Sequence, residues 1–212
     1  YNLEKKKLNF VSYIITVYNK RKYLHDVFKA LCAEGGNHKR EYIFVDDGST
    51  DNTTLVLKNL SLKLPGKLII LKRGNLGASF STNQAVKMAS AYWIRLLDGD
   101  DLVTYKSTTR MLYLAKLNKV SFVYGLISEE KVSQYNRYYK FVKQSRVEGL
   151  KKFIRNCPAN SSSILVSKSR FLGSGGCNET FISPDQVLFL RLFSSGPGVF
   201  LDHVVAKLPK AH

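Results

Sequence analysis

Short, uninterrupted apolar runs recur through the first hundred residues, and segments with helical spacing separate them. The apolar runs are rich in β-branched and aromatic residues, which predicts buried strands at residues 10–17, 42–45, 68–71 and 92–97. Apolar side chains three and four positions apart predict helices at residues 22–33, about 50–62 with Ser49 or Thr50 as its cap, and 78–89. Strands that alternate with helices imply right-handed crossovers and a mixed, mainly parallel sheet flanked by helices, an α/β fold.

The second half of the chain has a less regular pattern. We expect a helix at 104–117, a strand at 120–124, a hairpin over 126–143 that turns at 135–137, a short helix at 148–155 and a strand at 163–166. A final helix is expected from Pro184 to Phe193, because Ser183 can cap it and Gln186 completes a capping box. Without a repeat or linker, we expect one domain over residues 1–212. Because position 1 is Tyr, we expect flanking segments to be missing from this chain.

The net charge of the chain says more about its binding partners than its composition does. Lys and Arg number 33 against 16 acids, a net charge of +17, which creates a positive field around the protein. The basic residues are spread along the chain and form no nucleic-acid motif, so we expect an anionic membrane surface or anionic substrate as partner, and no nucleic acid. A compositional bias of the source genome would explain the charge equally well. Three cysteines without a CxxC pair fit a reducing cytoplasm.

Two acidic clusters directly follow predicted strands. Asp46 and Asp47 end the second strand, and Asp98, Asp100 and Asp101 end the fourth. In a parallel sheet, ligands bind beyond the carboxyl ends of the strands, so the two clusters are expected to share one pocket. The alternative for each acid is a turn former or a helix cap.

Asp98 and Asp100 are separated by one glycine, so both carboxylates can turn toward one cation. Mg²⁺ and Mn²⁺ take such oxygen ligands and complete their shells with substrate phosphates. At the other strand end, the carboxylate of Asp46 can accept a hydrogen bond from an imide N–H of uracil or guanine. These two assignments predict a metal site and a base-reading site at the same edge of the sheet.

Four segments of the chain resemble the family 2 glycosyltransferases of GT-A fold in order and spacing: ITVYNK, YIFVDDGSTDNT, NLGASFSTNQAV and LLDGDD. The resemblance covers about residues 10–103 and is looser beyond. It implies a nucleotide-sugar donor, a UDP-sugar first, bound by residues 1–103, and an acceptor bound by 104–212. The implied donor contacts are Thr16, where the family usually has Pro, Tyr18, Asn19, Asp46, Asp47, Asn75, Gly77, Asn83 and Asp98.

The resemblance also implies the metal and catalytic residues. Asp100 corresponds to the direct ligand of Mn²⁺ or Mg²⁺, with Asp98 beside it, and His203 is a further candidate ligand, although a lone histidine by a strand is more often structural. The family's catalytic base is an acid at a helix start, often in a Glu-Asp pair. Asp185 holds this position here with Pro184 in place of Glu, and Glu179 is the alternative. A carboxylate in a first helical turn also stabilises the helix through its dipole.

The implied activity is sugar transfer with inversion to a hydroxyl of a glycan, lipid-linked or protein acceptor, in cell-surface polysaccharide or glycolipid synthesis. We expect the protein in the cytoplasm, at the inner face of the membrane. Two rivals stay open: a nucleotidyltransferase of similar fold, and a catalytically silent binding module. The first should carry a Gly-rich loop after the first strand, where this chain has Tyr18-Asn19-Lys20-Arg21.

Overall fold

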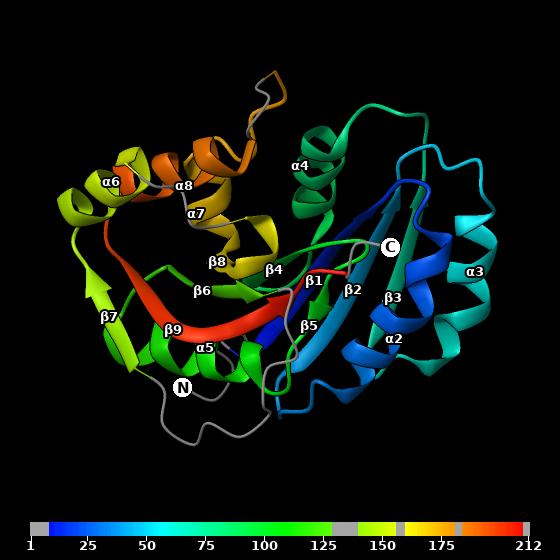
Figure 1. The fold of residues 1–212 in the computed structure, drawn as a ribbon, viewed down its shortest axis with the longest axis horizontal. Coiled ribbons are helices and arrows are strands. Elements are labelled where there is room, and N and C mark those ends of the chain that lie inside the picture. Colours follow the sequence, from blue (N-terminus) through cyan, green and yellow to red (C-terminus); the bar gives the residue numbers. More distant parts are fainter. Residues whose placement is uncertain (1–8, 129–139, 156–159, 181–183, 210–212) are drawn as a thin grey trace.

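The computed structural model describes residues 9–128, 140–155, 160–180 and 184–209 (Figure 1). Within these ranges the strands are β1 (Phe10–Val17), β2 (Lys39–Asp46), β3 (Lys67–Lys72), β4 (Trp93–Asp98), β5 (Leu102–Val103), β6 (Phe122–Ser128), β7 (Lys140–Gln144), β8 (Ile164–Ser167) and β9 (Gly198–Lys207). They form one sheet in the order β3-β2-β1-β4-β8-β6-β9-β5, with β7 beside β9. Strands β1 to β4 are parallel to one another, and the remaining pairings are mixed, as predicted for the fold class.

Helices cover both faces of this sheet. They are α2 (Leu24–Ala33), α3 (Thr53–Leu60), α4 (Ala78–Met88), α5 (Ser107–Asn118), α6 (Arg146–Arg155), α7 (Lys168–Gly173) and α8 (Pro184–Ser194), with short 3₁₀ turns η1 (Arg21–Tyr23), η2 (Ser61–Lys63) and η3 (Ser161–Ser163). One apolar core joins the sheet to α2, α3 and α5, and a second joins its other face to α4, α6, α7 and α8. Because both faces are covered, the central strands are apolar throughout, which explains why their sequence runs predicted them.

Two helix starts differ from the prediction. The cap predicted at Ser49 or Thr50 is wrong: α3 begins at Thr53 after Asn52, which has a φ of +64°, and the Asp51 carboxylate accepts a hydrogen bond from the Thr53 amide at 3.1 Å. Helix α5 begins three residues late because Leu102 and Val103 pair with β9 as a short strand. The acidic turn is therefore followed by a strand and not directly by a helix.

The predicted hairpin over residues 126–143 is also wrong. Strand β9 lies between β6 and β7, parallel to the first and antiparallel to the second, so β6 and β7 do not pair. Its predicted turn at 135–137 lies outside the described residues, as does Ser183 of the predicted capping box. Helix α8 begins at Pro184 as predicted, whereas α7 and β9 were not expected from the sequence.

The sheet runs through both halves of the chain. Strand β4 from the first half pairs with β8 from the second, with Trp93 opposite Ser167. Among the residues that the structure describes, every helix is too short or too polar to span a lipid bilayer. The shared sheet therefore places the end of β4 and the elements of the second half next to each other.

Candidate functional site

The strand register brings the two predicted acidic clusters to one edge of the sheet. Asp46 lies opposite Val17, the last residue of β1, and Asp98 lies opposite Thr16 on the other side of the same strand. Two strand spacings separate the backbones of the two aspartates, about 10 Å. Thr16, a predicted donor contact, lies between Val45 and Asp98. Asp46 and Asp98 therefore flank the end of β1, as the sequence predicted.

Residues 98–101 form a tight turn that only glycine can enter at its second position. The Asp101 amide donates to the Asp98 carbonyl at 3.1 Å. A Cβ on Gly99 would lie 2.6 Å from the Thr16 carbonyl oxygen and would overlap the Val17 side chain. This close packing fixes the backbone of the turn against β1 and so fixes the directions of the acids on either side of Gly99.

The turn η3 joins Asp98 to Asp185. The Ser161 hydroxyl donates to Oδ1 of Asp98 at 3.2 Å. The Asp185 carboxylate lies close enough to the same serine for the Ser161 amide and hydroxyl to lower its pKa. The Ser162 hydroxyl accepts from the Asp98 amide at 2.8 Å. Asp185 stands in the first turn of α8, so a single serine brings the predicted base and the strand-end acid to one site. The structure thus brings together the acids that sequence reasoning assigned to separate tasks.

Burial and mutual repulsion perturb these acids. Burial raises the pKa of Asp98 to about 6, and the nearby carboxylates of Asp185 and Asp100 act in the same direction. Burial, with Asp98 and Asp100, raises the pKa of Asp101 to about 7. Burial also raises the pKa of Asp185, against the hydrogen bonds from Ser161. Carboxylates crowded in a partly dry site are expected to bind a cation or a proton. Lys20 supplies one cation already, since its ammonium group pairs with Asp100.

The sequence did not lead us to Ser161 or Ser162, nor to the buried Arg95 that hydrogen-bonds the Ser162 carbonyl. The Arg95 side chain is fully buried and donates to the carbonyls of Ser162 at 2.6 Å, Ile164 at 3.0 Å and Val205 at 3.2 Å. Arg95 therefore ties β4 to η3, β8 and β9 behind the site. An arginine inside an otherwise apolar strand, YWIRLL, was the signal that could have revealed it, because buried charges are retained where they satisfy several acceptors.

Asp46 and Asp47 hold the loops at the other side of the site. Asp46 is fully buried and accepts from the Ser49 amide at 2.9 Å and from the Thr54 hydroxyl. Asp47 accepts from the amides of Leu76 at 3.1 Å and Gly77 at 2.8 Å, and from the Ser81 hydroxyl at 2.9 Å. Asp47 thus fixes the segment that contains the predicted contacts Asn75 and Gly77. The base-reading role of Asp46 stays a prediction.

The loop after β1 is joined to the loop after β2. Asn19 has a φ of +53°, its side-chain oxygen accepts from the Thr50 amide at 2.9 Å, and its own amide donates to Ser49 at 2.9 Å. Tyr18 next to it is 47% exposed, so its ring is available to a ligand. Of the predicted donor contacts in this loop, Asn19 orients the loop and Tyr18 offers an open surface.

Asn83 connects the first half of the chain to the segment that precedes α8. Its amide nitrogen donates to the Cys177 carbonyl at 2.9 Å and to Glu179 at 2.8 Å, and its oxygen accepts from the Cys177 amide at 2.9 Å. The predicted donor contact therefore holds Glu179, the alternative base, through a hydrogen bond. Asp185 lies beside Ser161 instead.

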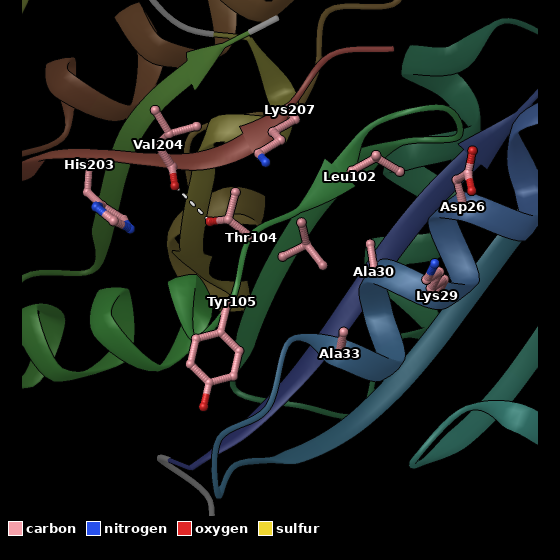
Figure 2. Close-up of a pocket in the computed structure, with 11 residues that line it drawn as sticks. Asp26, Lys29, Ala30, Ala33, Leu102, Thr104, Tyr105, His203, Val204 and Lys207 are labelled. Carbon is pink, nitrogen blue, oxygen red and sulfur yellow. Dashed lines mark hydrogen bonds between the residues drawn. The ribbon is translucent and has the colours of Figure 1, made fainter. Parts of the chain in front are cut away.

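His203 lies elsewhere. Its Nε2 is 3.2 Å from a guanidinium nitrogen of Arg110, and burial together with Arg110 lowers its pKa. It lines a cavity of about 470 Å³ between α2, β5 and β9, whose lining contains none of the predicted acids (Figure 2). A divalent ion at this nitrogen would lie against the guanidinium, which opposes the predicted ligand role of His203. The metal roles of Asp98 and Asp100 stay predictions.

The donor set of the site fits a divalent ion that is completed by its substrate. Asp98 and Asp100 supply carboxylate oxygens, the donors that Mg²⁺ and Mn²⁺ prefer, and Mg²⁺ commonly uses one or two carboxylates together with phosphate. Within the described ranges, no three His, Cys, Asp or Glu side chains gather as a metal-binding group. The remaining ligands would have to come from water and from phosphate oxygens of a bound donor.

Comparison with known proteins identifies the family and the fold of the chain. The sequence model of the glycosyl transferase family 2 matches residues 12–172. Over 104 residues, 48% of this chain, the sequence is 30% identical to the minor teichoic acid biosynthesis protein GgaB of Bacillus subtilis. The chain spans only 12% of GgaB's length.

Solved structures show the same fold at low sequence identity. S. aureus TarS 1–349 in complex with UDP-GlcNAc superposes with a TM-score of 0.76 at 17% identity, over 95% of this chain and 59% of that one. The mannosyltransferase PcManGT of Pyrobaculum calidifontis, in complex with GDP-Man and Mn²⁺, superposes with a TM-score of 0.71 at 15% identity, over 94% of this chain and 57% of that one. The fold is the GT-A fold that the resemblance implied.

Proposed function

The chain belongs to glycosyl transferase family 2, and we propose from this that it transfers a sugar from a nucleotide-diphosphate sugar to an acceptor hydroxyl, with inversion at the anomeric carbon. One observation carries the proposal: Ser161 donates to Asp98, at the predicted donor side, and lies beside Asp185, the predicted base, whose charge also acts on Asp98. A displacement needs charge neutralisation on the leaving group and proton removal from the nucleophile. The juxtaposed acids can serve both tasks within one site.

In the proposed reaction, Asp185 accepts the proton of the acceptor hydroxyl. The acceptor oxygen forms a bond to the anomeric carbon as the bond from that carbon to the diphosphate oxygen breaks, and the nucleoside diphosphate leaves with the electron pair. Attack from the face opposite the leaving group inverts the configuration. Burial raises the pKa of Asp185, which makes its carboxylate a stronger proton acceptor.

Asp98 and Asp100 are the proposed ligands of Mn²⁺ or Mg²⁺. When bound, such an ion neutralises charge on the diphosphate leaving group as a Lewis acid. The proposed donor contacts Thr16, Tyr18 and Asp46 lie along the end of β1 and β2, and Asp47 supports them by fixing the segment at Gly77. We assign residues 1–103 to donor binding and 104–212 to acceptor binding within a single domain.

The proposed substrates follow from the relatives. TarS was solved with UDP-GlcNAc and PcManGT with GDP-Man, so we propose a nucleotide-sugar donor, a UDP-sugar first. GgaB is named for minor teichoic acid biosynthesis, which supports a cell-surface polysaccharide or glycolipid as the product. We place the acceptor, a glycan, lipid-linked or protein hydroxyl, at the cytoplasmic face of the membrane. The nucleotidyltransferase and silent-module alternatives receive no support from the matched family.

A ligand screen and two variants test this function. Melting temperature is measured with UDP-, GDP-, dTDP- and CMP-sugars, each with and without Mn²⁺, because a ligand that binds only the folded state raises the melting temperature. Transfer or hydrolysis of the donor that binds is then followed. Asp185→Asn should keep the melting shift and lose turnover, whereas Asp100→Asn should lose the Mn²⁺-dependent part of the shift.

Asp202→Asn is the matched control, because Asp202 is an exposed acid on β9 and should change neither quantity. Undiminished Mn²⁺-dependent binding by Asp100→Asn contradicts the metal assignment. Full turnover by Asp185→Asn contradicts the base assignment and returns Glu179 to consideration. A protein that melts unchanged with every nucleotide-sugar contradicts the proposed function as a whole.

A further inference from the structure

Exposed apolar side chains occur on β7 and on α6, the helix that follows it. Val142 on the strand is 56% exposed, and Val147 and Ile154 on the helix are 58% and 68% exposed. Val147 and Ile154 are seven positions apart, so they share one face of α6, and Lys151 lies on that face between them. We call this the β7–α6 surface and define it by Lys140, Val142, Val147, Lys151, Ile154 and Arg155.

The opposite face of α6 is firmly packed, which fixes the direction of this surface. Gly149 lies so close to Phe193 of α8 that a Cβ would overlap the ring. Phe153 stacks on Phe189 at 4.7 Å between ring centroids, with 4° between the planes. The helix cannot rotate to bury Val147 and Ile154 without breaking these contacts. Within the described part of the chain, nothing covers them.

The same segment is strongly basic. Residues 140–155 carry six Lys and Arg and one acid, Glu148, a net charge of +5 in sixteen residues. Glu148 is held at the helix start by Ser145, whose amide and hydroxyl both donate to its carboxylate, at 2.9 and 2.7 Å. Lysines and arginines thus alternate with exposed aliphatic side chains. This combination is typical of helices that lie in the interface of a lipid bilayer.

We propose that the β7–α6 surface binds an anionic bilayer, with Val147 and Ile154 in the headgroup region and the basic side chains on lipid phosphates. Charge decides between the possible partners. A second copy of this chain would bring two surfaces of the same positive charge together, which repels. A soluble polyanion would leave the aliphatic side chains in water, whereas a bilayer accepts both kinds of group.

The location of the surface suits the proposed transfer but does not depend on it. Helix α6 packs against α8, whose first turn carries Asp185, and β7 lies at the outer edge of the sheet beside β9 (Figure 1). A bilayer on this surface would lie on the second-half side of the molecule, where we place acceptor binding. Membrane attachment requires no nucleotide and no metal, so it can be measured apart from the proposed activity.

Vesicle sedimentation tests the proposal. The full chain is mixed with vesicles of phosphatidylcholine alone and with vesicles that also contain phosphatidylglycerol. Binding is expected only to the second kind and should weaken as salt is added. Ile154→Ser should lower the partition coefficient roughly tenfold through the lost apolar burial. Lys151→Ser should lower the partition coefficient about fivefold, because the variant loses the attraction of one positive charge to the anionic lipid surface.

Leu62→Ser and Lys63→Ser are the matched controls. Leu62 is 97% exposed and Lys63 is exposed beside it, in η2 at the other end of the sheet, so neither change should affect binding. Thermal unfolding should be the same for all four variants, because every changed side chain is exposed. Equal losses in control and test variants would overturn the proposal. A dimer that Ile154→Ser disperses would also overturn it, by assigning the surface to a second copy.

Discussion

The Gly99→Ala substitution tests whether the acidic turn depends on its packing against β1. The added Cβ would lie 2.6 Å from the Thr16 carbonyl oxygen, where ordinary contact begins at 3.4 Å, and would also meet Val17. Both neighbours belong to a central strand, so neither can move aside as a flexible side chain would. Overpacking of this kind costs about 1–3 kcal/mol.

In a protein of this size, a cost of about 1–3 kcal/mol lowers the melting temperature by roughly 2–12 °C. Gly173→Ala is the matched control, because a Cβ there meets nothing within 4 Å. Any glycine-to-alanine change also gains about 0.4–1 kcal/mol by restricting the unfolded chain, and the control measures that gain. The difference between the two variants therefore isolates the clash.

Thermal unfolding and the melting shift with UDP and Mn²⁺ are the two assays. Gly99→Ala should melt below Gly173→Ala and should bind nucleotide more weakly, because the displaced turn carries Asp98 and Asp100. The reasoning is refuted if both variants melt together. It is refuted in its second step if Gly99→Ala is destabilised but binds nucleotide as tightly as the unchanged protein.

Three further outcomes are expected. Burial, with Arg40 and Lys116, lowers the pKa of His38 to about 3 from 6.5, so the folded protein gains stability above pH 6.5 and loses it as pH falls. In urea unfolding, the stability of the unchanged protein relative to His38→Gln should fall by about 2 kcal/mol from pH 7.5 to pH 5. The comparison with the variant is needed because the raised pKa values of Asp98 and Asp101 change stability in the opposite direction over the same range. Ser161→Ala should reduce turnover about tenfold to a hundredfold and should also weaken Mn²⁺-dependent donor binding, because the lost hydrogen bond is to Asp98, a proposed metal ligand, and hydrogen bonds to charged groups contribute about 1.5–3 kcal/mol. Arg95→Met should destabilise the protein by about 3 kcal/mol or more in thermal unfolding, because four buried carbonyls lose the hydrogen bonds that the guanidinium donates.

The first half of the fold could be predicted because its strands are central and parallel. Strand β1 has helices on both faces, so most positions from Phe10 to Val17 are apolar. Such a run is recognisable as a buried strand from the sequence. Strand β9 could not be predicted in the same way. It contains Asp202 and His203, and its partners β6 and β7 are determined by contacts between segments far apart in the chain.

The acids of the site could be predicted from their positions, but the groups that connect them could not. A carboxylate after a buried strand is unusual enough to be noticed, whereas Asn160-Ser161-Ser162-Ser163 has the composition of any loop. Ser161 matters because Asp98 and Asp185 both lie beside it, although they are 63 and 24 positions away from it in the sequence. No local pattern encodes such a meeting, since it depends on β8 pairing with β4.

The net charge of the protein and the local charge of the site have opposite signs, and together they constrain what can bind. A net charge of +17 attracts an anionic nucleotide-sugar from a distance. At the end of β4 the proposed ligand would meet Asp98, Asp100 and Asp101, and burial and neighbouring carboxylates raise the pKa values of Asp98 and Asp101. Phosphate cannot approach these carboxylates without a cation between them, and Lys20 balances only one. The positive protein would attract the donor from a distance, but the carboxylates would repel its phosphates at the site unless a divalent ion neutralised them. Donor affinity should therefore depend far more steeply on the concentration of divalent ions than on overall salt.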